Sequence, residues 1–209
     1  LEEDSNWEEQ MDRVMFTKPI AGTAFKKIYF DPVLKHNVSE MVLAQDLVIP
    51  YKAKSLEKAI RITHVLHLSR NEIYERIARG IFLNNLKDVT GKPQGVSVIQ
   101  QVGDSIQGQH ETSGDDDAPI TLLEQHRYLD LDGDGYAEPY IVTVAQETKT
   151  VQRIVARYFP DGISKKGDKI LYIRPEHFFI KYGMIPSPDG GIYDRGFGSL
   201  LGPLNMSVN

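Results

Sequence analysis

Cysteine is absent from this chain of 209 residues. Without a thiol the protein can form neither a disulfide framework nor a thiolate metal site, which excludes disulfide-stapled scaffolds and thiol enzymes. Long apolar runs are also missing, since none approaches the roughly 20 residues that a helix needs to cross a bilayer. We therefore expect no membrane partner, and a protein compatible with a reducing cytoplasm.

Positive charge is in short supply. The chain has 24 Lys and Arg residues against 29 Asp and Glu residues, which gives a net charge of -5. A protein that grips phosphates by counterion release needs clustered basic residues, and the pairs Lys26-Lys27 and Lys165-Lys166 are too small for that. The composition therefore argues against an electrostatic grip on nucleic acid, while 41% hydrophobic residues are enough for one moderate core or two small ones.

The first hundred residues mix helix and strand signals. Two capping boxes, Ser5-x-x-Glu8 and Ser69-x-x-Glu72, predict helices that run to about residues 17 and 80, the first ended by Lys18-Pro19. The second helix has an apolar stripe of Ile73, Ile77 and Ile81. Apolar alternation or short buried runs predict strands at residues 22–30, 38–43, 46–50 and 61–68.

The second half of the chain changes character. Residues 103–119 hold almost nothing apolar, include the acid run Asp115-Asp116-Asp117, and are interpreted as a flexible acidic loop with a solvated charge run. Closely spaced β patterns follow at residues 122–129, 140–146, 151–159 and 169–173 and predict an antiparallel meander. A helical pattern from Leu200, with Pro203 in its first turn, is still running at Asn209, so we expect a helix that the chain end truncates.

These patterns predict an α+β fold, with antiparallel β-sheets or a meander and a few short amphipathic helices. The expected subregions are a mixed strand and helix region (1–102), the acidic loop (103–119), the meander (120–199) and the truncated helix (200–209).

The sharpest local motif begins at Asp130. Asp130, Asp132 and Asp134 alternate and are followed by Gly135, as in the first half of a calcium loop, where carboxylates converge because the chain curls around one point. In that scheme Tyr136 supplies a backbone carbonyl and Glu138 a ninth-position contact. Two features count against an EF-hand: the twelfth position is Ile141 instead of a bidentate Glu, and the flanks are strands. Without a carboxylate at the twelfth position, the Ca²⁺ affinity should be weak.

The same residues also suit a plain β-hairpin turn, because Asp and Gly accept positive φ and Asp side chains cap their own backbone. Both interpretations stay open, and both place strands on either side of the turn.

No catalytic constellation emerges, so we do not expect an enzyme. His64 and His67 lie on opposite faces of one predicted strand and cannot share an ion. The other histidines, at positions 36, 110, 126 and 177, are scattered. Ser199 follows Gly198 but lacks the second glycine of a nucleophile elbow, and no phosphate-binding loop or dinucleotide fingerprint is present.

Three stretches together resemble one family. They are FDPVLKHNVSEMVLAQDLVIPYKAKSLEKAIRITHVLHLSRNEIYERIARGIF (30–82), LDLDGDGYAEPYIVTV (129–144) and RPEHFFIKYGMIPSPDGGIYDRGFGSLLGPLN (174–205). In this order and at these separations they resemble portal proteins of tailed bacteriophages, in the wing region that leads into the channel-lining stem helix.

The resemblance implies a structural role. Portals are rings, usually of twelve subunits, at one vertex of the capsid, where they contact capsid and scaffold proteins, the terminase motor and the head-completion and tail proteins. DNA passes through the channel without sequence-specific binding. The expected location is the virion, and the host cytoplasm during assembly.

Two alternatives compete with the portal. One is a calcium-dependent β-rich binding or adhesion module that uses the Asp130 loop. The other is a hydrolase with a metal at the same acids, which ranks last because the sequence names no general base and no pocket.

Overall fold

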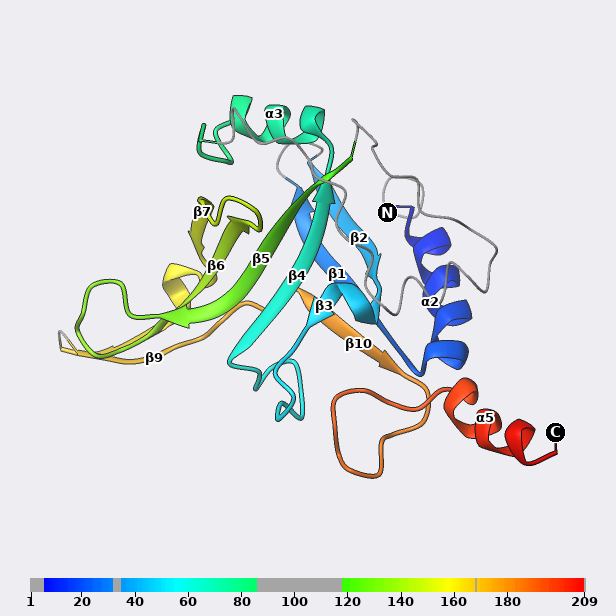
Figure 1. Ribbon diagram of the computed structural model, residues 1–209. Coiled ribbons are helices and arrows are strands. Elements are labelled where there is room, and N and C mark those ends of the chain that lie inside the picture. Colours follow the sequence, from blue (N-terminus) through cyan, green and yellow to red (C-terminus); the bar gives the residue numbers. More distant parts are fainter. Residues whose placement is uncertain (1–5, 32–34, 86–117, 168, 209) are drawn as a thin grey trace. The chain divides into compact units, whose positions relative to one another are not determined.

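The protein is described by a computed structural model for residues 6–31, 35–85, 118–167 and 169–208 (Figure 1). The chain divides into two units. Unit 1 comprises Leu1–His64, Gln125–Ile141 and Ala156–Asn209, and unit 2 comprises Val65–Glu124 and Val142–Val155. Helices and antiparallel sheets occur together, which confirms the α+β fold class.

A three-stranded antiparallel sheet organises unit 1. Its order is β10 (Phe179–Gly183), β1 (Thr23–Asp31), β2 (His36–Val42), with Phe25 opposite both Val42 and Lys181. The patterns at residues 22–30 and 38–43 are therefore confirmed as strands. β10 was not predicted, because Phe-Phe-Ile-Lys-Tyr has no clean alternation. Its pairing partner β1 lies far away in the sequence, since Gly183 stands opposite Thr23, 160 positions earlier.

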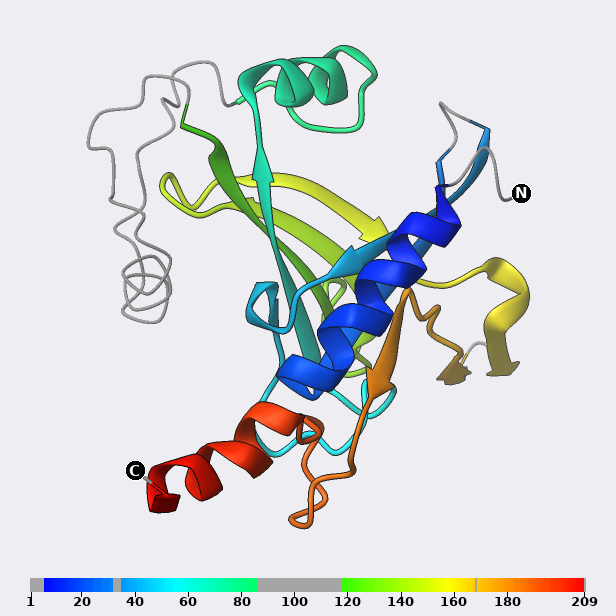
Figure 2. The same cartoon turned by 90° about the vertical axis from the view of Figure 1, so that its right-hand side faces the viewer.

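Helix α2 (Trp7–Ala21) packs against this sheet (Figure 2). Val14 is fully buried on its inner face, and the Gln10 Oε1 accepts a hydrogen bond from the Met41 N–H of β2 at 2.8 Å. The prediction that Lys18-Pro19 ends the helix is wrong, because Pro19 lies in the last turn and the helix stops at Gly22, with φ +88°. A proline there removes one helical hydrogen bond, whereas Gly22 adopts the left-handed conformation that closes the end. Ser5 lies outside the described residues.

The opposite face of the three-stranded sheet carries the core of unit 1. Its buried apolar side chains come from strands, loops and the segment before α5: Phe25, Val42, Leu47, Ile49, Ala59, Ile62, Phe179 and Ile192. Successive residues of β1 therefore serve two layers, with Phe25 in this core and Lys26 toward Trp7 of α2.

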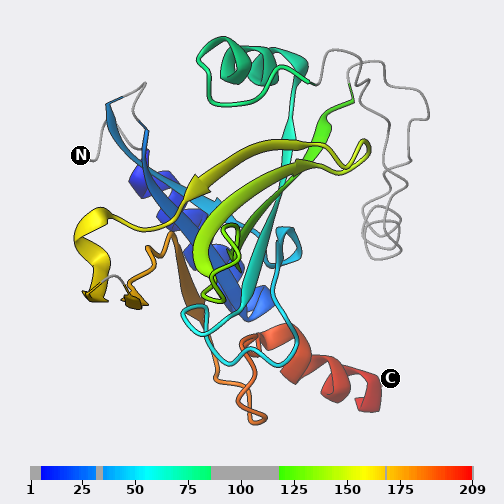
Figure 3. The same ribbon diagram turned by 90° about the vertical axis from the view of Figure 1, so that its left-hand side faces the viewer.

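A second sheet has five strands whose order in the sheet is the same as their order in the sequence (Figure 3). The order is β3 (Leu47–Val48), β4 (Arg61–Leu68), β5 (Ile120–Leu129), β6 (Glu138–Ala145) and β7 (Val151–Ala156). The patterns at residues 61–68, 122–129 and 140–146 are confirmed. The run predicted at 46–50 shortens to two strand residues after the 3-10 turn η1 (Ala44–Asp46).

The predicted fourth meander strand does not join this sheet. β9 (Lys169–Ile173) pairs with β8 (Ile163–Lys166), which follows the 3-10 turn η2 (Pro160–Gly162), in a separate two-stranded ribbon. β7 ends at Ala156, three residues before the predicted limit, because the chain leaves the sheet toward η2. Most of the acidic loop predicted at residues 103–119, with its three aspartates, lies outside the described residues.

Unit 2 has its own core beneath helix α3 (Arg70–Ala78). The predicted capping box is confirmed: Ser69 Oγ accepts from the Glu72 N–H at 3.3 Å, and Glu72 Oε2 accepts from the Ser69 N–H at 2.8 Å. The predicted stripe also packs inward, with Ile73 buried and its stripe partners half-buried. The core around them consists of Leu68, Phe82, Ile120, Leu122 and Ala145.

Helix α5 (Phe197–Val208) begins three residues before the predicted start, so Pro203 lies inside it and not in its first turn. Its start is set by a close contact with the end of α2. A Cβ at Gly22 would lie 2.3 Å from the Asp194 carbonyl oxygen, and one at Gly196 would lie 2.4 Å from that of Ile20. Only glycine allows these backbones to approach so closely.

Asp194 anchors the same junction through its side chain and its backbone. Its N–H donates to Thr23 Oγ1 at 2.7 Å, and its Oδ2 lies 2.9 Å from the Lys181 Nζ. The side chain of Asp194 is only 10% exposed, so this ion pair is shielded from solvent more than a surface pair is.

Replacing Gly196 by alanine should therefore cost about 1–3 kcal/mol of the free energy of unfolding, because the new methyl group meets backbone that cannot move aside. Urea denaturation measures this cost. Gly202→Ala is the matched control within α5: nothing lies within 4 Å of a Cβ there, and alanine should raise helix stability by about 0.5–1 kcal/mol. Equal effects of the two substitutions would contradict the close packing.

Candidate functional site

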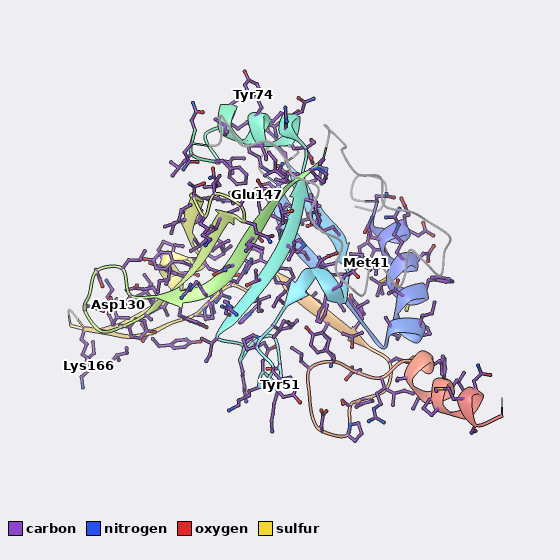
Figure 4. The ribbon with its side chains drawn as sticks, in the orientation of Figure 1. Met41, Tyr51, Tyr74, Asp130, Glu147 and Lys166 are labelled. Carbon is purple, nitrogen blue, oxygen red and sulfur yellow. The ribbon has the colours of Figure 1, made fainter. Side chains whose placement is uncertain are left out.

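The turn between β5 and β6 brings three of the five predicted ligand residues together. Asp130, Asp132 and Asp134 are exposed, and one carboxylate oxygen from each lies within 4.8 Å of the other two. Figure 4 shows Asp130 where this turn leaves β5. Within the described residues no other group of three His, Asp or Glu side chains meets this spacing. Three carboxylates so close together can hold a divalent cation through oxygen ligands.

The same carboxylates also cap the turn. Asp130 accepts from the N–H groups of Gly133 at 2.7 Å and Gly135 at 3.0 Å, and Asp134 accepts from the Tyr136 N–H at 2.7 Å. Gly133 and Gly135 have φ of +77° and +90°, as the turn interpretation requires. The loop is thus held in shape by its own hydrogen bonds, so its geometry suits both the hairpin turn and the cation loop.

Tyr136 and Glu138 do not join the carboxylate group. The Tyr136 hydroxyl oxygen accepts from the Ile173 N–H of β9 at 3.1 Å and so ties the turn to the ribbon. Glu138 is 6% exposed at the start of β6, and its Oε2 has no hydrogen-bond partner. The structure therefore places Glu138 in the protein interior behind the loop instead of among the exposed aspartates.

Negative charge gathers around the start of β6. Burial raises the pKa of Tyr140, and the carboxylates of Glu138 and Asp132 and the neighbouring Tyr158 raise it further. A raised tyrosine pKa reports a place where additional negative charge is disfavoured. A cation at the aspartates would relieve part of that potential.

Three of the histidines occupy structural positions. His64 and His126 are buried and pack edge-on against Phe179, with ring centroids 5.7 and 5.0 Å apart. His67 Nδ1 lies 3.2 Å from Thr121 Oγ1. None of these three belongs to a group that could hold a metal in the part of the chain that the structure describes.

Lys26 is a buried charged residue that the sequence did not single out. It is 0% exposed, its Nζ has no hydrogen-bond partner, and that atom lies 5.2 Å from the centroid of the Trp7 ring. Burial lowers the pKa of Lys26. The face of the Trp7 indole ring attracts the ammonium group of Lys26. This one contact does not replace the hydration that the group loses on burial, because the pKa is lowered, as desolvation requires.

A second candidate surface is apolar and exposed. On α2, Phe16 and Ile20 are 74% and 59% exposed, and the neighbouring helix α5 exposes Leu201 and Met206 by 56% and 83%. The two helices are in contact, and Figure 2 shows the end of α2 beside the start of α5. Large apolar side chains gathered on two adjacent helices are typical of protein–protein interfaces.

No protein-family model matches this chain. No curated protein matches it significantly either. None of the described helices is long and apolar enough to cross a membrane.

Lys26→Met should stabilise the protein at neutral pH by about 1–3 kcal/mol, because methionine fills a similar volume and removes a buried polar group that has no hydrogen-bond partner. The folded-state pKa lies below the unfolded value of 10.5, so the deficit of the wild type is present below the folded pKa and disappears as the pH rises toward 10.5. The gain in melting temperature should therefore shrink in alkaline buffer.

Lys27→Met is the matched control on the other face of β1. Lys27 Nζ lies 3.9 Å from a carboxylate oxygen of Glu40, so its substitution removes an ion pair and should give no gain. A gain for Lys27→Met equal to that for Lys26→Met would contradict the assignment.

Proposed function

We propose that this chain is a structural part of the portal ring of a tailed bacteriophage, on the wing side that leads into the stem helix. The proposal starts from the three sequence stretches and their order. The α+β fold agrees with it. Helix α5 begins within the third stretch and runs past its end, where a stem-like helix is expected.

The observation that carries the proposal is the apolar exposure of α5. Phe197, Leu201 and Met206 are 46%, 56% and 83% exposed on one short helix. A short helix that exposes several large apolar side chains needs further surfaces to cover them. In a ring, the adjacent subunit supplies such a surface for each copy. The same heterologous contact repeats around the ring until the ring closes.

The proposed partners follow from this role. The chain would contact other copies of itself, about twelve in the usual portal ring by resemblance, together with capsid or scaffold, terminase and head-completion or tail proteins. DNA would pass through the channel at the portal vertex. The net charge of -5 supports passage without a strong grip on phosphates. A structural role, and not a catalytic one, is proposed.

Electron microscopy and native mass spectrometry of the full natural protein test the ring. We expect closed rings with a central channel. Leu201→Asp combined with Met206→Asp should abolish ring assembly without lowering the melting temperature, because both side chains are exposed in the single chain. Asn205→Asp, an exposed polar position of the same helix, is the matched control and should assemble normally. A full-length protein that stays monomeric at high concentration would overturn the proposal.

A calcium-dependent binding module is the second candidate, favoured by the three carboxylates within 4.8 Å of one another. If Asp130, Asp132 and Asp134 hold Ca²⁺ in the folded state, calcium must stabilise that state, by about 2.7 kcal/mol at one hundred times the dissociation constant. Differential scanning fluorimetry should show a rise in melting temperature with Ca²⁺ that Asp132→Asn removes. An unchanged melting temperature at millimolar calcium sinks this candidate.

A further inference from the structure

The ribbon β8–β9 is an exposed element with little support of its own. It has two strands and a register shift between Ser164 and Lys165. On β9, Leu171 and Tyr172 are 54% and 55% exposed. Two-stranded ribbons are marginally stable in water unless another surface covers them. The exposed apolar side chains of the ribbon therefore indicate a surface that contacts something else.

The ribbon is also basic. Lys165, Lys166 and Lys169 are all exposed near its turn, and Figure 4 shows Lys166 projecting there. None of the three forms an ion pair with a described residue. Arg174, farther along, is within 3.9 Å of Asp161, but both side chains are mostly exposed. A contact surface of this kind fits an acidic partner with an apolar centre.

The Asp130 loop of unit 1 has the complementary character. Asp130, Asp132 and Asp134 are exposed and form no ion pair with a described residue, and Leu131 between them is 55% exposed. The loop therefore offers three acidic side chains and one apolar side chain, and the ribbon offers three basic side chains and two apolar ones.

The two surfaces do not satisfy each other within one chain. Tyr136 ties the base of the loop to Ile173, yet no described lysine of the ribbon reaches a loop carboxylate. In Figure 3 the turn between β5 and β6 and the ribbon do not overlap. A contact between loop and ribbon builds a ring when each copy uses the two surfaces on two different neighbours, which makes the contact heterologous; the reciprocal use of both surfaces by one pair gives a two-fold dimer instead.

We propose that the ribbon β8–β9 of one copy docks on the Asp130–Asp134 loop of a second copy of this chain. The lysines face the three carboxylates, and Leu131 packs against Leu171 and Tyr172. The inference rests on the proposed function, because it assigns one subunit contact of that ring.

Charge reversal tests the contact in the full-length protein, with a chelator present so that the loop carboxylates stay free of divalent cations. One variant carries Lys165→Glu with Lys166→Glu, and the other carries Asp130→Lys with Asp132→Lys. Sedimentation velocity should show each variant alone associating at least about tenfold more weakly than the wild type, which corresponds to about 1.4 kcal/mol. An equimolar mixture should recover wild-type association, because each acidic ribbon then meets a basic loop.

The matched control reverses two exposed lysines elsewhere in unit 1, Lys52→Glu with Lys54→Glu, and should associate like the wild type. Raising the salt from about 0.1 M to about 1 M shortens the Debye length from about 10 to about 3 Å and should weaken wild-type association.

Each result has a distinct meaning. Rings that form normally from either charge-reversed variant would overturn the docking and leave the portal proposal standing. Charge-dependent association that yields open chains and never rings would overturn the portal and leave the docking standing. A mixture that associates no better than its components would overturn the docking, as would a wild type that never associates.

Discussion

The close approach of Gly22 and Gly196 is the constraint on which the rest of unit 1 depends. A Cβ at either position would collide with backbone atoms. The end of α2 and the segment before α5 can therefore approach this closely only because both positions are glycine. The contact is secured by Asp194, which bonds Thr23 at the start of β1 and Lys181 in β10. One junction thereby sets where α2 ends, where β1 begins and how α5 leaves the sheet.

The charged residues of unit 1 differ in their exposure to solvent. Lys26 is buried between β1 and α2 with only the Trp7 ring nearby, which costs stability. The aspartates of the β5–β6 turn and the lysines of the ribbon are exposed, where desolvation is small and the charges stay available to a partner. Burial therefore makes the charge of Lys26 important for folding stability, while the exposed charges of the turn and the ribbon cost little stability.

The proposed functions draw on surfaces instead of a cavity. α5 and α2 present apolar side chains, and the turn and ribbon present opposite charges, so the described part of unit 1 has several different faces suited to protein contacts. A ring subunit needs two unlike faces that meet in every neighbouring pair. A cation at Asp130, Asp132 and Asp134 would compete with the ribbon for the same carboxylates, which links the calcium candidate to the subunit contact.

The sequence by itself determined what depends on neighbours along the chain. The Ser69–Glu72 capping box, the alternation in β4 and β5 and the curled Asp130 turn all follow from local hydrogen bonding and side-chain period. Only the tertiary structure decided what depends on distant partners: β10 beside β1, β9 in a ribbon outside the meander, Lys26 beneath Trp7, and Glu138 buried behind the aspartates. Pairing and burial arise from residues far apart in sequence, and no local pattern encodes which of two adjacent lysines faces the helix.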